Sequence, residues 1–123
     1  MGHKLKIMYV DDEELNLKLF ELNFNKRYEV ITAECGITAL NLLEKHLDTK
    51  FVISDMKMPR ITGLEFIQKA KIKYPDIKYC ILSGYNMTHE IQEALDTKLI
   101  LKYFRKPFDV NEIDNTIKSV LNN

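Results

Sequence analysis

Phe51-Val52-Ile53-Ser54-Asp55 is a short run of residues that suit a buried β-strand and that end in one carboxylate. Pro59 follows four residues later, and it stops the strand because proline has no backbone N–H to give to a sheet. A carboxylate at the end of such a strand sits on a rigid element beside a loop, which is where ligands collect in open α/β sheets. Asp55 is therefore the first candidate for a functional residue.

The composition of the 123 residues fits one small domain. Lys plus Arg and Asp plus Glu number 18 each, and this neutral balance gives no reason to expect attraction to nucleic acid or to a membrane. No apolar run approaches membrane-spanning length, and the N-terminus lacks the apolar core of a signal peptide. We therefore expect a cytoplasmic chain in which residues 1–123 form a single domain, with Met1-Gly2-His3 as a disordered or cloning-derived leader.

Strand-like and helix-like segments alternate five times along the chain. The predicted strands cover residues 4–10, 28–33, 51–55, 78–82 and 101–105. The predicted helices cover about residues 14–25, 38–46, 64–74 and 88–96, and a last helix follows a capping box of Asp109 with Glu112. Because no linker or internal repeat interrupts this order, it predicts an α/β fold with a parallel sheet and helices on both faces.

Apolar residues at helical spacing predict the buried face of each helix. In the first helix, Leu15, Leu19 and Leu22 are expected on one face, flanked by Phe20 and Phe24. The other predicted stripes are Leu40, Leu43 and Leu47 in the second helix, Ile91, Ala94 and Leu95 in the fourth, and Val110, Ile113, Ile117, Val120 and Leu121 in the last.

Polar residues stand at the ends of four predicted strands. Right-handed crossovers place the C-terminal ends of parallel strands on one edge of the sheet. The side chains expected to converge there are Asp11 and Asp12 after the first strand, Asp55 at the third, Ser83 at the fourth and Lys106 after the fifth. Crowded carboxylates repel one another, and Mg²⁺ relieves this repulsion because it prefers oxygen ligands, waters and phosphate oxygens.

One carboxylate beside such a metal can attack phosphorus as a nucleophile and form an acyl phosphate. The metal and Lys106 would offset charge on the transferring group, and the Ser83 hydroxyl could donate to a remaining phosphate oxygen. Taken singly, the motifs have plainer interpretations: acidic residues after a strand are typical of a helix start, and Ser83-Gly84 is typical of a turn. The combination at four strand ends indicates a phosphate-and-metal site.

In these combined motifs the chain resembles the receiver domain of two-component response regulators (the CheY-like superfamily), in its single-domain or excised form. The motifs are Val10-Asp11-Asp12-Glu13, Ile53–Pro59 with Gly63, Leu82-Ser83-Gly84, and Tyr103–Phe108. The resemblance covers residues 5–121. It implies a doubly wound, flavodoxin-like sheet of five parallel strands in the order 2-1-3-4-5, with two helices on one face and three on the other.

The resemblance also implies a phosphoryl-transfer role. Asp55 would accept a phosphoryl group from a phosphohistidine of a partner histidine kinase or phosphotransfer protein. Asp12, Asp55 and the backbone carbonyl of Lys57 would bind Mg²⁺, with Asp11 acting largely through water. Lys106 would pair with the phosphoryl group, and its bond to the following proline is expected to be cis.

Further positions are assigned to a switch and to its lifetime. Ser83 takes the Ser/Thr switch position and Tyr103 the aromatic switch position, and they would alter the face of helix four, strand five and helix five, where a downstream effector or a second copy of the chain would bind. Lys57 and Tyr85 take the positions that tune how fast the acyl phosphate hydrolyses. We expect these two side chains to slow hydrolysis and so to lengthen the lifetime of the phosphoryl group. The chain would then be a signalling domain rather than an enzyme, with only slow self-phosphorylation and autodephosphorylation.

Two other classes of function share this fold: a binding module, and a cofactor carrier or enzyme. A receiver-like binding module that is never phosphorylated usually lacks one of the acidic pair, the acceptor or the lysine, and all are present here. A flavodoxin-like carrier needs a hydroxyl-rich phosphate loop where this chain has Asp11 and Asp12. An aspartate-nucleophile phosphatase needs a second aspartate two residues after the nucleophile, where this chain has Lys57.

Overall fold

The computed structural model describes residues 4–121, so the leader expected at residues 1–3 lies outside the described part of the chain. The elements in order are β1 Leu5–Val10, α1 Glu14–Phe24, β2 Tyr28–Ala33, α2 Gly36–Lys45, β3 Thr49–Asp55, α3 Gly63–Lys73, β4 Lys78–Ser83, α4 His89–Asp96, β5 Lys102–Arg105 and α5 Val110–Leu121. All strand pairs are parallel, and the sheet order is β2-β1-β3-β4-β5. The expected fold class and strand order are confirmed.

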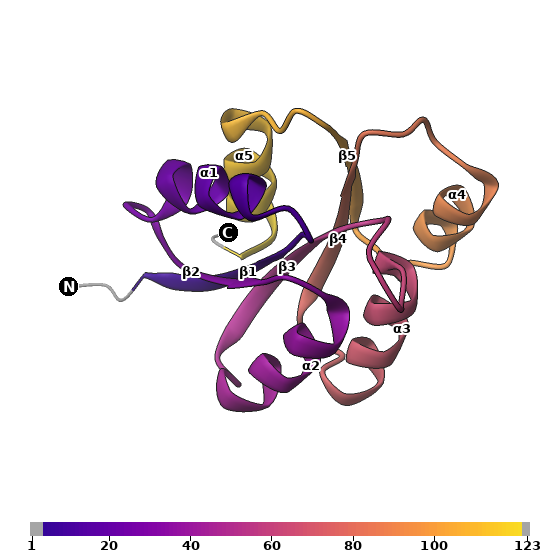
Figure 1. Cartoon of the computed structure of the whole chain (residues 1–123), viewed down its shortest axis with the longest axis horizontal. Coiled ribbons are helices and arrows are strands. Elements are labelled where there is room, and N and C mark those ends of the chain that lie inside the picture. Colours follow the sequence, from indigo (N-terminus) through magenta and orange to yellow (C-terminus); the bar gives the residue numbers. More distant parts are fainter. Residues whose placement is uncertain (1–3, 122–123) are drawn as a thin grey trace.

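Helices cover both faces of the sheet, with α1 and α5 on one side and α2, α3 and α4 on the other (Figure 1). Because successive side chains of a strand point to opposite faces, β1 contributes to both cores. Met8 and Val10 pack with the α2, α3 and α4 layer, whereas Ile7 and Tyr9 pack with the α1 and α5 layer. Within residues 4–121, no helix is long and apolar enough to cross a membrane.

The buried face of α1 differs from the predicted one. Leu15, Leu19 and Leu22 were expected inside, but their exposed fractions are 67%, 43% and 70%. Phe20 and Phe24 are fully buried instead. At 100° per residue, the leucines and the phenylalanines lie on opposite sides of the helix, and the aromatic side buries the larger apolar area. The leucine stripe is thus left on the surface.

Two other helices also depart from the expected pattern. Helix α2 begins at Gly36 rather than Thr38 and ends at Lys45, which leaves Leu47 beyond the helix and 73% exposed. In α5 the Asp109 carboxylate accepts from the backbone N–H of Glu112, at 3.2 Å, but the Glu112 carboxylate lies 3.8 Å from Lys102 Nζ instead of completing the predicted capping box.

The complete capping box belongs to α3. The Thr62 hydroxyl accepts from the backbone N–H of Glu65 at 3.1 Å, and the Glu65 carboxylate accepts from that of Thr62 at 2.8 Å. The first residue of the helix, Gly63, lies against the end of β3: a Cβ atom there would stand 2.2 Å from the Asp55 carbonyl oxygen. Glycine therefore allows α3 to begin directly behind the candidate acceptor.

Candidate functional site

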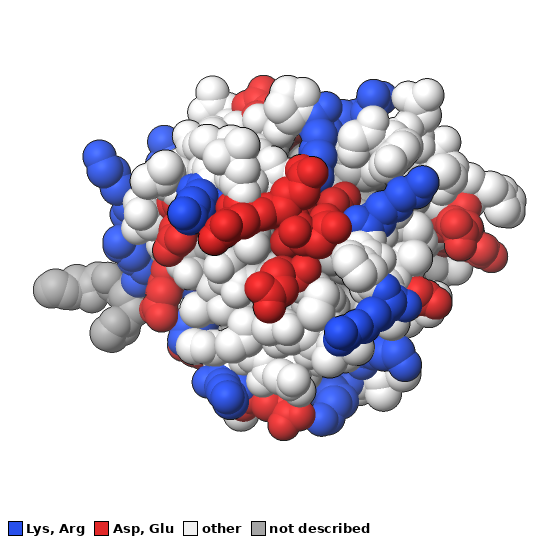
Figure 2. All heavy atoms as spheres, viewed as in Figure 1, with Lys and Arg blue, Asp and Glu red and all other residues white. Residues whose placement is uncertain are grey.

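Three carboxylates meet at the C-terminal edge of the sheet. One oxygen from each of Asp11, Asp12 and Asp55 lies within 4.8 Å of the other two. Asp11 and Asp55 are buried and Asp12 is exposed. Figure 2 shows a patch of acidic side chains near the middle of this face of the molecule, over the loops that follow β1 and β3. The sequence predicted this convergence, and the structure confirms it.

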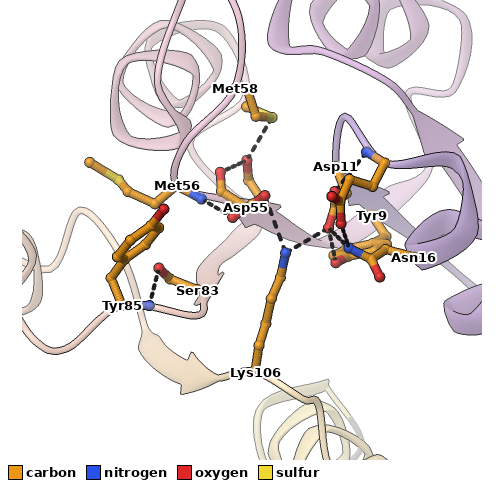
Figure 3. Close-up of polar contacts among 11 residues, drawn as sticks. Tyr9, Asp11, Asn16, Asp55, Met56, Met58, Ser83, Tyr85 and Lys106 are labelled. Carbon is orange, nitrogen blue, oxygen red and sulfur yellow. Dashed lines mark hydrogen bonds and ion pairs between the residues drawn. The ribbon is translucent and has the colours of Figure 1, made fainter.

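Lys106 joins two of these carboxylates. Its Nζ lies 3.0 Å from Asp11 Oδ2 and 3.2 Å from Asp55 Oδ2 (Figure 3). The backbone N–H of Lys106 donates to the Ser83 carbonyl at 2.9 Å, which fixes the end of β5 to the end of β4. The bond from Lys106 to Pro107 is cis, as expected. One ammonium group thus pairs with two of the three carboxylates, and the site keeps a surplus of negative charge.

The electrostatics reflect this surplus. Burial raises the pKa of Asp55 above its ordinary value; the positive charge of Lys106 opposes the rise, and the Asp11 carboxylate adds to it. Burial alone would lower the pKa of Lys106, but its hydrogen bond to Asp11 and the charge of Asp55 raise that pKa overall. Asp55 therefore lacks part of the positive charge that would fully stabilise its ionised form.

Two residues near Asp11 were not predicted to belong to the site. The buried phenol of Tyr9 donates to Asp11 Oδ2 at 2.6 Å, and the amide of Asn16 donates to the same oxygen at 3.2 Å (Figure 3). The other oxygen, Oδ1, accepts from the backbone N–H of Glu13 at 2.9 Å. Tyr9 looks like an ordinary buried strand residue in the sequence, and only its hydroxyl distinguishes it from a phenylalanine.

The remaining predicted site residues are Lys57 and Tyr85, on the loops after β3 and β4, Ser83 at the end of β4 and Tyr103 within β5. Ser83 is fully buried, and its hydroxyl accepts from the Tyr85 backbone N–H at 3.1 Å. Lys57 Nζ lies 4.4 Å from the centre of the Tyr85 ring, a cation–π distance. The Tyr103 hydroxyl donates to the Tyr85 carbonyl. The two switch candidates and the lifetime candidate Lys57 thus all contact Tyr85.

The donor set fits a hard divalent cation. The carboxylates of Asp11, Asp12 and Asp55 offer only oxygen ligands, and their surplus charge favours a cation such as Mg²⁺. Asp55 Oδ1 already accepts from the backbone N–H of Met56, at 2.8 Å, so this carboxylate is held in one orientation. An acidic triad of this kind is typical of a Mg²⁺ site. That the backbone carbonyl of Lys57 is a further ligand of the metal remains a prediction.

Comparison with known proteins places the chain in one family. The family model for the response regulator receiver domain matches residues 7–118. The chain is 33% identical over 117 residues to sporulation initiation phosphotransferase F of Bacillus subtilis (strain 168), a match that covers 94% of this chain and 93% of that protein. Receiver domains of this family are generally signalling domains rather than enzymes.

Solved structures agree with this placement. A response regulator receiver domain protein from Clostridium thermocellum has a TM-score of 0.88 at 26% identity, with 95% of this chain and 94% of that chain covered. The response regulator TrrA of Thermotoga maritima, solved in complex with Mg²⁺ and BeF, has a TM-score of 0.82 at 30% identity, with 97% and 100% covered. Both similarities span nearly the whole chain.

Proposed function

We propose that this chain, which belongs to the family of response regulator receiver domains, accepts a phosphoryl group on Asp55 from the phosphohistidine of a histidine kinase or phosphotransfer protein. The observation that carries the proposal is the bridge of Lys106 between Asp11 and Asp55, beside an acidic triad. An ammonium group held 3.2 Å from the acceptor carboxylate is already placed to pair with an incoming phosphoryl group.

Each residue has a part in the proposed transfer. Asp55 Oδ2 attacks phosphorus, and the bond from phosphorus to the donor nitrogen breaks. Asp12, Asp55 and the Lys57 carbonyl would hold Mg²⁺, with Asp11 acting through water, and the bound metal would supply positive charge for the phosphoryl oxygens. Lys106 gives up part of its contact with Asp55 to pair with the phosphoryl group.

The output side of the proposal uses the contacts around Tyr85. Phosphorylation adds nearly two negative charges beside Ser83, whose hydroxyl would leave the Tyr85 backbone N–H to donate to the phosphoryl group. Tyr103, now bonded to the Tyr85 carbonyl, would then turn inward and change the face of α4, β5 and α5. A downstream effector or a second copy of the chain would bind this face in the cytoplasm.

The donor protein would dock on the other side of the site. The exposed leucine stripe of α1 lies next to a cleft of about 590 Å³ that Lys106 also lines. Leu19 belongs to both surfaces, and Pro107, Phe108 and Val110 add further apolar lining to the cleft. Exposed apolar patches beside a reactive group favour protein binding.

Leu19→Asn should slow transfer from a phosphorylated histidine kinase but not from acetyl phosphate. Ile72→Asn, on the exposed surface of α3, is the matched control.

The other functions weighed from the sequence have less support. The phosphate of a flavin carrier would meet the charge of Asp11 and Asp12, which repels it. An aspartate-nucleophile phosphatase needs a second acid where Lys57 stands over the Tyr85 ring. An unphosphorylated binding module would have no use for a lysine bridging the acceptor.

Labelling with acetyl phosphate tests the proposal. The wild type should be labelled only with Mg²⁺ present, and Asp55→Asn should lose the label, because an amide oxygen is a poor nucleophile. Asp76→Asn, at an exposed position in the turn before β4, is the control and should label normally. If Asp55→Asn labels as well as the wild type, Asp55 is not the acceptor. Unchanged Tyr103 ring orientation on adding beryllofluoride would refute the switch.

A further inference from the structure

The Asp11 carboxylate is more heavily hydrogen-bonded than a simple metal ligand needs to be. Its Oδ2 accepts from three donors: the Tyr9 phenol at 2.6 Å, Lys106 Nζ at 3.0 Å and the Asn16 amide at 3.2 Å. Of these, the Tyr9 contact is the shortest and the only one made between two fully buried side chains. Hydrogen bonds to a charged acceptor are stronger than those between neutral groups, so the buried Tyr9 phenol holds Asp11 firmly alongside the Lys106 ion pair.

An aromatic stack fixes the Tyr9 ring. Tyr9 stacks on Phe20 with 4.4 Å between ring centres and 19° between planes, and Phe20 stacks on Phe24 at 4.4 Å. Phe108, two residues after Lys106, packs edge-on against Phe20 at 5.5 Å. The same phenylalanine of α1 therefore supports the ring that holds Asp11 and the loop that carries Lys106.

We propose that Tyr9 is a positioning residue that divides Lys106 between the two carboxylates it bridges. By donating to Asp11 Oδ2, the phenol offsets charge on that oxygen, so Asp11 attracts Lys106 less and more of the ammonium remains available to Asp55. The same donor keeps Asp11 Oδ2 engaged, which favours contact with the metal through water over direct ligation. This inference rests on the proposed function, because it concerns the metal and the phosphoryl group of that site.

Removing the Tyr9 hydroxyl should strengthen Mg²⁺ binding and slow labelling by acetyl phosphate. In Tyr9→Phe the ring stack stays, but Asp11 carries more uncompensated charge. Mg²⁺ should bind about threefold to tenfold more tightly, because the cation meets a more negative set of oxygens. Lys106 should be drawn toward Asp11 and away from Asp55, so labelling by acetyl phosphate at saturating Mg²⁺ should slow by about threefold to tenfold.

Tyr28 provides a matched control. Its phenol also donates to a buried carboxylate, that of Asp114, and its ring packs against Phe24 at the far end of the same stack. Tyr28→Phe removes the same chemical group from the same aromatic cluster, away from the metal site. It should lower stability to a similar degree as Tyr9→Phe and leave both the Mg²⁺ affinity and the labelling rate at wild-type values.

Calorimetric titration of each purified variant with Mg²⁺, without a phosphodonor, separates this inference from phosphoryl transfer itself. Tighter Mg²⁺ binding with slower labelling in Tyr9→Phe supports it. Equal Mg²⁺ affinity in Tyr9→Phe and Tyr28→Phe, or weaker binding together with slower labelling, overturns it and leaves Tyr9 with a structural role. Asn16→Ala, which removes a longer bond to the same oxygen, should shift both quantities in the same directions by less. Loss of labelling in Asp55→Asn is independent of these affinities, so either idea can fail alone.

Discussion

Two buried carboxylates in this protein accept a phenol hydrogen bond from opposite ends of one aromatic stack, yet their surroundings differ. Asp114 accepts from Tyr28, and its Oδ2 lies 3.0 Å from Arg27 Nη1 and 3.1 Å from Lys118 Nζ. Asp11 accepts from Tyr9, but it shares one lysine with Asp55 and also faces Asp12. The first centre has more cations than acids, and the second has more acids than cations.

The pKa directions follow this difference. Burial pushes the pKa of Asp114 upward, but the hydrogen bonds of Tyr28 and Lys118 and the charges of Lys118 and Arg27 bring it below its ordinary value. The pKa of Asp55 stays raised, because burial and Asp11 outweigh Lys106. We call the cluster around Asp114, whose charges are paired, the closed centre, and the site of Asp11, Asp12 and Asp55, which has too few cations, the open centre. The closed centre stabilises the fold, whereas the open centre would be stabilised by binding a cation.

Of the predicted changes, loss of Mg²⁺ from the open centre should have the largest effect, and that effect is on labelling of Asp55. Chelation of Mg²⁺, or Asp12→Asn, should reduce labelling by acetyl phosphate by more than about 100-fold, because the metal offsets charge on the transferring group. Asp114→Asn should leave labelling unchanged, since that centre has no part in the transfer. Comparable labelling of Asp12→Asn and the wild type at the same Mg²⁺ concentration would show that the acidic triad is not the metal site.

Changes to the closed centre should instead lower the stability of the fold. Asp114→Asn should lower the free energy of unfolding by about 2 kcal/mol, because it leaves two cations and a buried phenol without their charged partner. The cations are about half exposed and can turn to solvent, which limits the loss. Urea denaturation of this variant beside exposed Asp76→Asn, expected within about 0.5 kcal/mol of wild type, provides the measurement. Equal midpoints for the two variants would show that the centre is not stabilising.

The sequence predicted the carboxylates and the lysine of the open centre but not its Tyr9 and Asn16 contacts, and it predicted nothing of the closed centre. Asp11 and Lys106 follow predicted strands and Asp55 ends one, and the topology of parallel strands brings such positions to one edge. Asp114 sits in a helix beside Ile113, and no local pattern shows that a side chain of β2 will reach it. Contacts between residues separated by 86 positions depend on packing that periodicity does not describe.

Helix α1 shows the same limit from the other direction. Its leucine stripe and its phenylalanine stripe are both apolar at helical spacing, so periodicity alone could not choose between them. Phe20 and Phe24 are buried because they complete the stack that begins at Tyr9, a partner visible only in three dimensions. The hydroxyl of Tyr9 was overlooked for a related reason: strand periodicity predicts which side chains are buried, but not which hydrogen bonds they make.

Ionisation of Asp114 and of Asp55 should change the stability of the fold in opposite directions as the pH changes. The folded pKa of Asp114 is lowered, so its contribution to stability is present above its unfolded pKa of about 3.9 and is lost as the pH falls through the folded value. The folded pKa of Asp55 is raised, so its ionisation reduces stability as the pH rises through that value. Without Mg²⁺ at pH 7, Asp55→Asn should therefore be more stable than wild type, on the order of 1 kcal/mol, and Asp114→Asn less stable. In urea titrations the Asp55→Asn difference should shrink as the pH falls toward 4, whereas the Asp114→Asn difference should persist there and shrink only below about pH 3.9. A constant difference for Asp55→Asn would contradict its raised pKa.

The smallest expected effect concerns how the open centre keeps water out after phosphorylation. Lys57 and Tyr85 approach from the loops after β3 and β4 and contact each other at 4.4 Å, so together they can screen the acyl phosphate. Lys57→Ala and Tyr85→Ala should each speed loss of the label by about threefold, and the double variant should add little, because both single changes break the same contact. Lys50→Ala, at an exposed position within β3, is the control. Fully additive effects would mean that the two side chains screen water separately, and the cation–π pair would then have no role in the lifetime of the phosphoryl group.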